Sequence, residues 1–244
     1  MAERLDATLV ARGIVPTLER AEQEVRAGNV LMDERVADKP GAVVPEGAVL
    51  RLRVGPRRFV SRGGLKLEAA LDHFGVSPAG HTCADFGAST GGFTDCLLQR
   101  GAARVYAVDV GYGQLAWSLR TDPRVVVMER TNVRHLSGLP EPIDLLVGDL
   151  SFISLASVLP GMWTVMASGA EAVVLVKPQF EVGPSGLEAG GRVRDDGLRL
   201  AALAEVAKAA VAIGFVVVAE MECPVAGARA GNREWLVHLR KPPC

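Results

Sequence analysis

A glycine-rich stretch, Asp85-Phe86-Gly87-Ala88-Ser89-Thr90-Gly91-Gly92-Phe93, decides how this 244-residue chain folds. It follows an apolar run and leads into a helical pattern, so it predicts a strand, a tight turn and a helix that begins near Thr90. Three glycines allow backbone conformations and close approaches that side chains would block, and the first turn of a helix leaves N–H groups free for a ligand. An ordinary turn built from small residues is the alternative interpretation.

A second acidic residue favours a ligand site. Asp109 ends the next predicted strand, at about the distance where a doubly wound sheet places a carboxylate beneath a ribose. Dinucleotide sites use G-x-G-x-x-G so that the pyrophosphate rests on the helix, whereas this chain has D-x-G-x-x-x-G-G. Asp85 would repel a diphosphate but suits a ligand with an amino group, such as S-adenosyl-L-methionine. We therefore expect this cofactor, bound by Asp85, by the turn from Gly87 to Phe93 and by Asp109.

The composition describes a globular protein with one full core and room for a small second domain, because 49% of the residues are hydrophobic and 23% are charged. A net charge of −1 gives no global reason to expect nucleic acid. The longest apolar region is interrupted by Asp149 and Pro160, and the first residues lack the pattern of a secretion signal. The four cysteines and four histidines are dispersed. We expect a cytoplasmic protein without a membrane segment or a metal.

The sequence divides into a small N-terminal domain over residues 1–56, a linker over 57–61 and a larger domain over 62–244. The first part predicts helices over 5–12 and 17–27, with Thr17 as a helix cap, followed by short strands near 30–32, 43–44 and 49–54. Between Gly47 and Leu67 there is no acidic residue, while six are basic. Such a run is usually a solvated face, but it also suits contact with phosphates.

The second part alternates strands and helices. Strands are predicted over 82–87, 104–109, 125–128, 144–149, 172–177, 215–220 and 234–239, and helices over 65–74, 90–100, 114–120, 155–167 and 194–213. Nearly continuous apolar strands such as Val173 to Val176 indicate a parallel sheet that is covered on both faces. Ligands of such sheets bind beyond the carboxyl ends of the strands.

Four charged residues fall where they could meet: Asp149 and Lys177 close two of these strands, Lys66 lies on the helix before the sheet, and Glu234 opens the last strand. Simple surface charges are the alternative for any one of them. Methyl transfer from a sulfonium to an alcohol needs a base and two reactants held in line. Lys177 can be that base if Lys66 lowers its pKa, while Asp149 and Glu234 orient the two ammonium groups.

Two other kinds of methyl transfer lack their usual residues. Amino-group methylation of bases typically uses a D/N-P-P-Y/F loop, but Asp149 is followed by Leu-Ser-Phe without a proline. Carbon methylation of pyrimidines needs a nucleophilic cysteine near that strand end, and the Pro243-Cys244 pair lies far from it in sequence.

Several long motifs resemble those of the TlyA haemolysin-type ribosomal RNA methyltransferases. They are Gly87 to Thr94, Asp109 to Trp117, Asp149 to Leu155 and Lys177 to Glu181, and the resemblance extends over roughly residues 3–240. It implies an S4-type RNA-binding domain joined to an FtsJ-class, Rossmann-like methyltransferase domain of seven mostly parallel strands, the last one antiparallel. The implied activity is 2′-O-methylation of cytidines in ribosomal RNA, with ribosomal subunits as partners and sensitivity to capreomycin as a consequence.

The resemblance also assigns site residues. The Lys-Asp-Lys-Glu tetrad of the FtsJ class corresponds to Lys66, Asp149, Lys177 and Glu234, with the second lysine as the base. Asn132 would recognise the adenine side of the cofactor, where related enzymes carry an acid, and Asp149 is expected to contact the cofactor as well. RNA contacts are expected from these residues: Arg4, Lys39, Arg51, Arg53, Arg57, Arg58 and Arg62.

Two departures and two further hypotheses remain open. The second RNA-binding helix lacks the usual Ser-Arg start, and the R-x-W-V linker has Phe59 in place of tryptophan. A non-catalytic ribosome-binding or assembly factor with a vestigial cofactor pocket is one alternative function. A membrane-lytic protein, as the family's name suggests, is the other, although no spanning or strongly cationic amphipathic segment supports it. The sequence does not define the target RNA or the oligomeric state.

Overall fold

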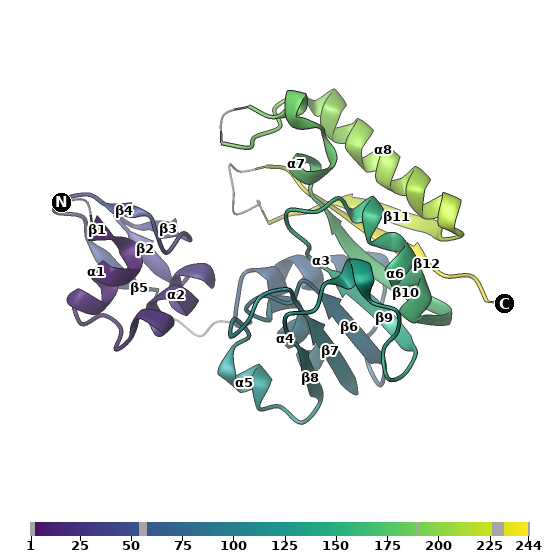
Figure 1. The fold of residues 1–244 in the computed structure, drawn as a ribbon, viewed down its shortest axis with the longest axis horizontal. Coiled ribbons are helices and arrows are strands. Elements are labelled where there is room, and N and C mark those ends of the chain that lie inside the picture. The colour runs from purple at the N-terminus through teal and green to yellow at the C-terminus, as the bar shows by residue number, and fades with distance from the viewer. Residues whose placement is uncertain (1–2, 54–57, 189, 226–231, 244) are drawn as a thin grey trace. The chain divides into compact units, whose positions relative to one another are not determined.

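The computed structural model describes residues 3–53, 58–188, 190–225 and 232–243. The chain divides into two compact units, Met1–Arg62 and Gly63–Cys244 (Figure 1). The predicted linker spans residues 57–61, and of these Arg57 lies outside the described residues. Each unit has its own buried core, and each is described separately below.

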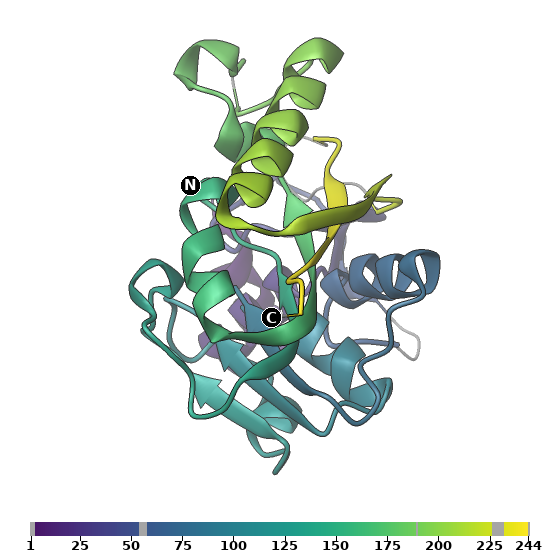
Figure 2. The same ribbon diagram turned by 90° about the vertical axis from the view of Figure 1, so that its right-hand side faces the viewer.

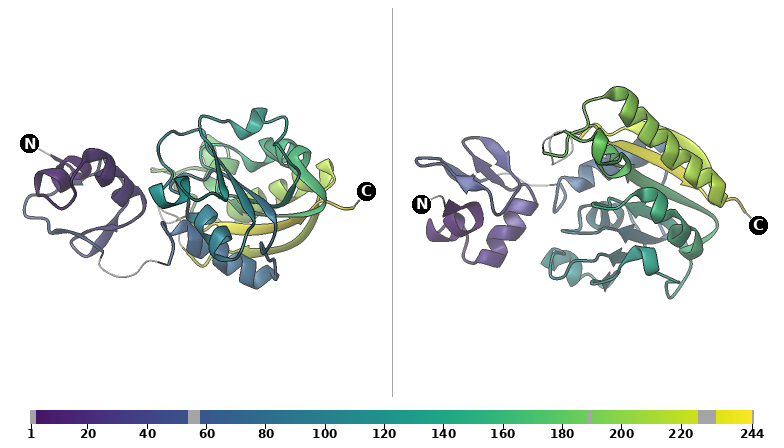
Figure 3. Two further views of the ribbon diagram at one scale, coloured as in Figure 1. Left: turned by 90° about the horizontal axis from the view of Figure 1, so that it is seen from below. Right: turned by 45° about the horizontal axis from the view of Figure 1, so that its top comes forward.

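The N-terminal unit contains two helices and two small antiparallel sheets, with strand orders β3-β2-β5 and β1-β4. Its elements are β1 (Glu3–Arg4), α1 (Leu5–Ala11), α2 (Leu18–Arg26), β2 (Val30–Met32), β3 (Arg35–Ala37), β4 (Val43–Val44) and β5 (Leu50–Leu52). The Thr17 side chain accepts a hydrogen bond from the backbone N–H of Arg20 at 3.2 Å, so it caps α2 as expected. The helices pack together, as the purple ribbons of Figure 3 show, and bury an apolar core that includes Leu5, Leu9 and Val25.

The hairpin between β2 and β3 depends on two residues with positive φ. Asp33 and Glu34 adopt φ angles of 48° and 63°, which a two-residue turn requires when it matches the twist of the strands. The sequence predicted the strand near residues 30–32 but did not predict β3 or β1. Both are strands of only two or three residues, too short for an alternating pattern to stand out.

The larger unit is built on a seven-stranded sheet with the order β11-β12-β10-β9-β6-β7-β8. Its strands are β6 (Thr82–Phe86), β7 (Arg104–Val108), β8 (Val125–Met128), β9 (Ile143–Gly148), β10 (Met166–Val176), β11 (Val216–Glu222) and β12 (Trp235–Arg240). β12 lies between β10 and β11, pairs antiparallel with both, and so runs opposite to the other six strands described in this sheet. The prediction of a mostly parallel α/β sheet with an antiparallel last strand is therefore confirmed.

Helices cover both faces of this sheet. They are α3 (Gly63–Phe74), α4 (Gly92–Gln99), α5 (Trp117–Arg120), α6 (Leu159–Val165), α7 (Pro178–Glu181) and α8 (Asp196–Ile213). Figure 2 shows α3 and α4, drawn in blue, on the face opposite to α6, and Figure 3 shows α8 along the β11 edge. On one face the strands pack against Leu159 and Met162 of α6 and Leu203 and Val206 of α8. Because α3 and α4 cover the other face, the strands are buried from both sides.

Two expected helices differ from the structure. The helix expected over 114–120 begins only at Trp117, because residues before it form the loop that follows β7. The helix expected over 155–167 is broken at Val158: a short 3-10 turn covers Leu155–Ser157, and α6 follows. A proline at the start of α6 explains the break, since Pro160 has no N–H to continue a helix from the preceding turn.

Candidate active site

The glycine turn brings the end of β6 against the end of β9. Gly87 has a φ of +85°, and a Cβ there would lie only 3.0 Å from the backbone oxygen of Asp149. The N–H of Asp149 in turn donates to the carbonyl of Phe86 at 3.1 Å. Gly91, the residue before α4, has a φ of +95°, and a side chain there would collide with Leu119. Both positions need glycine for conformation and for space.

The other residues of the turn contribute mainly backbone. Ala88, Thr90 and Phe93 are buried, and Gly92 is the first residue of α4. Ser89 adopts a left-handed φ of 49°, which points its N–H at the carboxylate of Asp109. The turn is therefore shaped to present backbone groups.

Asp85 is completely buried beneath this turn. Its Oδ2 accepts hydrogen bonds from the backbone N–H of Thr94 at 2.9 Å and from the Thr94 hydroxyl at 2.7 Å. Its Oδ1 has no hydrogen-bond partner among the described residues. Burial raises the pKa of Asp85 to about 7, against the effect of the Thr94 hydrogen bonds, and the charges of Asp149 and Asp109 add to the rise. A buried carboxylate oxygen without a partner is costly and marks a place where a ligand donor fits.

Asp109 follows β7 and uses both oxygens to order the surrounding loops. Oδ2 accepts from the N–H of Ser89 at 2.8 Å, and Oδ1 accepts from the N–H of Gly111 at 2.7 Å. A small hollow opens beside it at the carboxyl ends of β7 and β8, and Val127, Gln114 and Glu129 are among its lining residues. The hollow has an apolar wall and polar groups at its rim.

The structure gives Asn132 a different surrounding from the one expected. Its side chain is exposed and accepts a hydrogen bond from the N–H of Arg134 at 3.0 Å, which caps a 3-10 turn over Val133–His135. It does not line the hollow described above. Glu129 does, and it also accepts from the N–H of Gly113 at 2.8 Å. Its position directly after β8 was the signal that sequence reasoning missed.

The four charged residues predicted from strand ends lie in one cluster. Lys66 of α3 donates to Oε2 of Glu234 at 2.6 Å, and the Nζ of Lys177 lies 2.5 Å from Oδ1 of Asp149. Asp149 follows β9, Lys177 follows β10 and Glu234 precedes β12. Because β10 and β12 pair antiparallel up to Val176 and Trp235, Lys177 and Glu234 are the next residues on the two paired chains.

The charges in this cluster shift the pKa values of Lys66 and Asp149. Burial lowers the pKa of Lys66, but the charges of Asp149 and Glu234 outweigh it and raise this pKa above its ordinary value. Burial raises the pKa of Asp149, but the charges of Lys177 and Lys66 hold it below its usual range. The sequence suggested that Lys66 would act on Lys177. In the structure the charge of Lys66 is balanced by Glu234 and Asp149, so its repulsion of Lys177 is reduced.

Further hydrogen bonds join the segments that follow β9 and β10. Ser151 accepts from the Nζ of Lys177 at 2.8 Å. Glu181, at the end of α7, accepts from the hydroxyl of Ser154 at 2.6 Å and from the N–H of Leu155 at 2.7 Å. Burial raises the pKa of Glu181 despite these two bonds. Motif resemblance located these segments, but it did not show that they are joined.

An aromatic surface lies beside this junction. Phe152 is 70% exposed and has a positive φ of 65°. Its ring centroid lies 5.3 Å from that of Phe180, and the Nζ of Lys177 lies 6.0 Å from the Phe180 ring. An exposed aromatic ring next to an amine suits the face of a nucleobase.

The basic residues of the N-terminal unit are less free than their spacing suggested. Acidic side chains form ion pairs with three of them. Arg4 pairs with nearby Asp6, whereas Arg51 pairs with Glu34 and Arg62 with Asp38, both more distant in sequence. Lys39 and Arg53 are exposed, and Arg58 is exposed with its guanidinium 5.6 Å from the Phe59 ring. Arg57 lies outside the described residues.

The described parts of the chain lack two other kinds of feature, a metal cluster and a membrane-spanning helix. No group of three or more His, Cys, Asp and Glu side chains there could hold a metal ion. No helix there is both long and apolar enough to cross a membrane.

Comparison with known proteins matches both units to families. An FtsJ-like methyltransferase model matches residues 59–241, and an S4 domain model matches residues 3–50. The 16S/23S rRNA (cytidine-2′-O)-methyltransferase TlyA of Mycobacterium tuberculosis is 48% identical over 242 residues, which cover 97% of this chain and 89% of that protein.

Solved structures agree with these matches. A Streptococcus thermophilus structure that carries a hemolysin name has a TM-score of 0.77 and 41% identity, and the match covers 99% of this chain and 89% of that one. The N-methyltransferase NodS of Bradyrhizobium japonicum, solved with S-adenosyl-L-homocysteine, shares only the fold, with a TM-score of 0.53, 18% identity and coverage of 74% and 86%. From sequence and fold together, this chain belongs to the TlyA family, in which an S4 domain precedes an FtsJ-like methyltransferase domain.

Proposed function

We propose that this protein transfers a methyl group from S-adenosyl-L-methionine to the 2′-hydroxyl of a cytidine in ribosomal RNA. The observation that carries the proposal is the cluster of two ammonium–carboxylate pairs at the same sheet edge as the glycine turn. The TlyA relative of Mycobacterium tuberculosis is named for this reaction on 16S and 23S rRNA, and a relative from Campylobacter jejuni is named for 23S rRNA alone.

The residues around the turn fit S-adenosyl-L-methionine. The buried Oδ1 of Asp85, which has no hydrogen-bond partner among the described residues, suits the amino group of the cofactor. Asp109 keeps acceptor capacity on both oxygens for ribose hydroxyls. Val127, Gln114 and Glu129, which line the hollow beside Asp109, are placed to contact the adenine end of the cofactor. We assign the cofactor contacts to these groups and to the backbone of the glycine turn, and we assign Asn132 only a local cap.

The charged cluster supplies the remaining chemistry. The bound cofactor provides a methyl group on a sulfonium, ready for in-line displacement by an oxygen. Lys177, in its neutral form, takes the proton that the 2′-hydroxyl releases. Asp149 and Ser151 hold the Nζ of Lys177 in one position, and Glu234 does the same for Lys66. Phe152 and Phe180 offer a surface for the target base.

RNA binding is shared between the units in this proposal. S4 domains bind RNA, and the exposed Lys39 and Arg53 can contact phosphates without first breaking an ion pair recorded in the structure. Arg4, Arg51 and Arg62 would have to exchange a carboxylate for a phosphate. We therefore expect Lys39 and Arg53 to contribute more to affinity than the three paired arginines.

The proposal is tested by methyl transfer to ribosomal subunits purified from cells that lack this protein. Tritiated methyl should enter RNA with the wild type, and Lys177→Ala should lower the rate by about 10²–10⁴-fold while calorimetry shows unchanged S-adenosyl-L-methionine binding. Lys208→Ala is the matched control, because Lys208 is an exposed lysine on α8. Mapping of 2′-O-methyl positions then identifies the RNA. Absence of incorporation into either subunit would instead favour a non-catalytic ribosome-binding factor.

A further inference from the structure

Glu234 is held in place by its own chain on the downstream side. It directly precedes β12, and its carbonyl accepts a hydrogen bond from the N–H of Cys223 at 2.8 Å. Its carboxylate is only 3% exposed and binds Lys66. A second attachment of the chain upstream of Glu234 would further restrict the position of this carboxylate.

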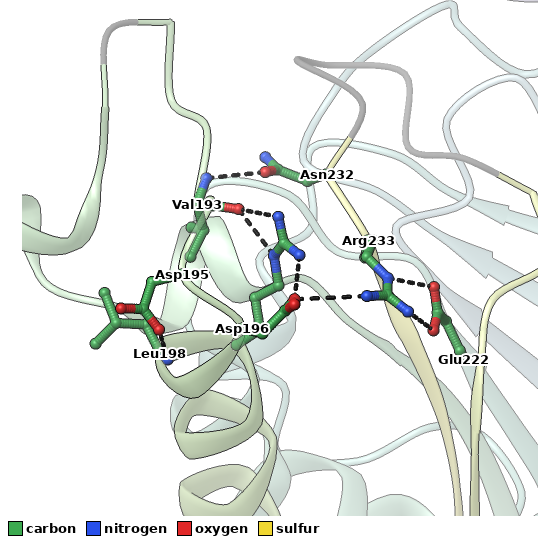
Figure 4. Close-up of polar contacts among 8 residues, drawn as sticks. Val193, Asp195, Asp196, Leu198, Glu222, Asn232 and Arg233 are labelled. Atoms are coloured by element: carbon green, nitrogen blue, oxygen red, sulfur yellow. Dashed lines mark hydrogen bonds and ion pairs between the residues drawn. The ribbon is translucent and has the colours of Figure 1, made fainter.

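Asn232 provides that second fixed point. Asn232 is 1% exposed, and both the oxygen and the nitrogen of its side-chain amide form hydrogen bonds with the backbone of another loop. Oδ1 accepts from the N–H of Val193 at 3.0 Å (Figure 4). Nδ2 donates to the carbonyl of Gly191 at 3.0 Å. A carboxylate could not make the second bond, because it has no donor. The amide group is therefore specifically required.

The loop that Asn232 binds, which contains Gly191 and Val193, is also hydrogen-bonded to α8. Val193 is fully buried, and its carbonyl accepts two hydrogen bonds from Arg199 of α8, at 2.8 Å from Nε and 2.6 Å from Nη2. Arg199 also pairs with Asp196 in the first turn of that helix. Asn232 thus ties the chain before Glu234 to a backbone segment that is hydrogen-bonded to α8.

The same loop starts at the other proposed catalytic lysine. The chain leaves β10 at Lys177, forms α7 and returns through Val193 to α8. Asn232 therefore links the segment that follows Lys177 to the segment that carries Glu234. Residues two apart on an extended chain lie on the same side, which matches Asn232 and Glu234 both pointing inward.

The residue between them points outward. Arg233 donates to both oxygens of Glu222, at 2.6 Å and 2.5 Å, and its Nη1 reaches Asp196 at 3.5 Å, as Figure 4 shows. These partners are exposed, and the arginine is 48% exposed. Arg233 belongs to the same network, but it faces away from the charged cluster.

We propose that Asn232 is a positioning residue for methyl transfer, which keeps Glu234 in register with Lys66 by clamping the Gly191–Val193 backbone. The inference rests on the proposed function of the charged cluster and goes beyond it by adding a residue that touches neither substrate nor cofactor. Without the clamp, Glu234 moves more freely and the Lys66 pair loosens. Binding of S-adenosyl-L-methionine is unaffected, since its proposed contacts lie at β6, β7 and β8.

The test compares Asn232→Ala with Arg233→Ala in the full-length protein on ribosomal subunits. We expect Asn232→Ala to lower kcat at least tenfold while the KM for S-adenosyl-L-methionine stays within twofold of wild type. Arg233→Ala should keep kcat within twofold. If Asn232→Ala does not fold, Asn232→Asp keeps the acceptor but loses the donor, and it should show the same split between kcat and KM.

The pH profile gives a readout that loss of stability alone would not change. Asp149, Glu234 and Cys223 act on the pKa of Lys66, and Lys177 lies in the same cluster through its ion pair with Asp149. Since Glu234 raises the pKa of Lys66, a loosened pair should move the alkaline limb of the kcat profile to lower pH in Asn232→Ala and in Glu234→Gln, but not in Arg233→Ala.

The outcomes separate the two proposals. An active wild type with an unchanged kcat and pH profile in Asn232→Ala overturns the positioning role alone. An equal loss of kcat in Asn232→Ala and Arg233→Ala also overturns it, because the network would then act only on stability. A wild type that transfers no methyl group overturns the proposed function and the positioning role together.

Discussion

The two units of this protein use ion pairs in opposite ways. In the methyltransferase unit, Lys66 pairs with Glu234, and these two side chains are 9% and 3% exposed. In the S4 unit, Arg51 and Glu34 pair with side chains that are 45% and 67% exposed. Water already stabilises the exposed charges, so that pair contributes little, whereas either member of the buried pair depends on its partner. An ion pair between a basic side chain and a glutamate therefore depends strongly on both partners in the methyltransferase unit, whereas in the S4 unit the partner is exchangeable.

The largest expected effect comes from breaking the buried pair. Glu234→Ala leaves the ammonium of Lys66 buried without its closest partner, which costs about 3–5 kcal/mol in proteins. For a domain of this size, this corresponds to a fall in Tm of roughly 10 °C, measured by calorimetry at pH 7. The raised pKa of Lys66 means that the contribution of the pair persists at neutral pH and is lost only in strongly alkaline solution. A Tm within 2 °C of wild type would place this pair with the exposed ones.

The next largest effect concerns the contact between the glycine turn and Asp149. Gly87→Ala forces a side chain into a left-handed φ and against the Asp149 carbonyl, so we expect a loss of about 1–3 kcal/mol in the free energy of unfolding. Gly75→Ala is the matched control, because Gly75 has a similar φ of +69° and the Cβ of an alanine there would meet no described atom within 4 Å. Equal losses in chemical denaturation would show that the close approach to Asp149 carries no energy of its own.

A smaller effect is expected from the buried carboxylate without an ion-pair partner. Folding raises the pKa of Asp85 to about 7, so between about pH 4 and 7 the folded protein holds a proton that the unfolded chain releases. Stability from this group therefore falls as pH rises through that window. We expect the Tm of Asp85→Asn minus the Tm of wild type to be several degrees higher at pH 8 than at pH 5. A pH-independent difference would mean that Asp85 is ionised throughout.

The smallest effect belongs to the exposed pair. Glu34→Ala should leave the Tm unchanged within error, because both partners are well solvated. It frees Arg51 for a phosphate, so RNA affinity should rise slightly and the dependence of log K on log salt should steepen by at most about one contact. Fluorescence anisotropy at roughly 50 to 200 mM salt measures both. A drop in Tm of the size expected for Glu234→Ala would falsify the contrast drawn above.

The sequence predicted the sheet and the charged cluster because both depend on short-range rules. Apolar runs marked the strands, and parallel strands bring their carboxyl ends to one edge, so Asp149 and Lys177 were expected together from the sequence alone. Glu234 was located by the same reasoning, although its strand runs in the opposite direction. The antiparallel pairing of β12 with β10 explains why the start of one strand meets the end of the other.

The remaining details depended on contacts between distant residues. Glu34 and Asp38 lie outside the acid-free stretch, so its spacing could not show that they pair with Arg51 and Arg62. These pairs form only when hairpins and loops close.

Two side-chain assignments also needed the folded chain. The choice between Asn132 and Glu129 at the hollow depended on where the loop after β8 turns. The bonds of Asn232 to Gly191 and Val193 span about forty residues, and no local pattern reveals them.

The strand order also determines when the site becomes complete during synthesis. A nascent chain that has emerged as far as Glu222 already contains Lys66, Asp149 and Lys177, but it lacks the carboxylate that neutralises Lys66. It also lacks β12, without which β11 has no neighbour in the sheet. A chain cut short before this strand would lack Glu234, so the proposed catalytic cluster would be incomplete in it.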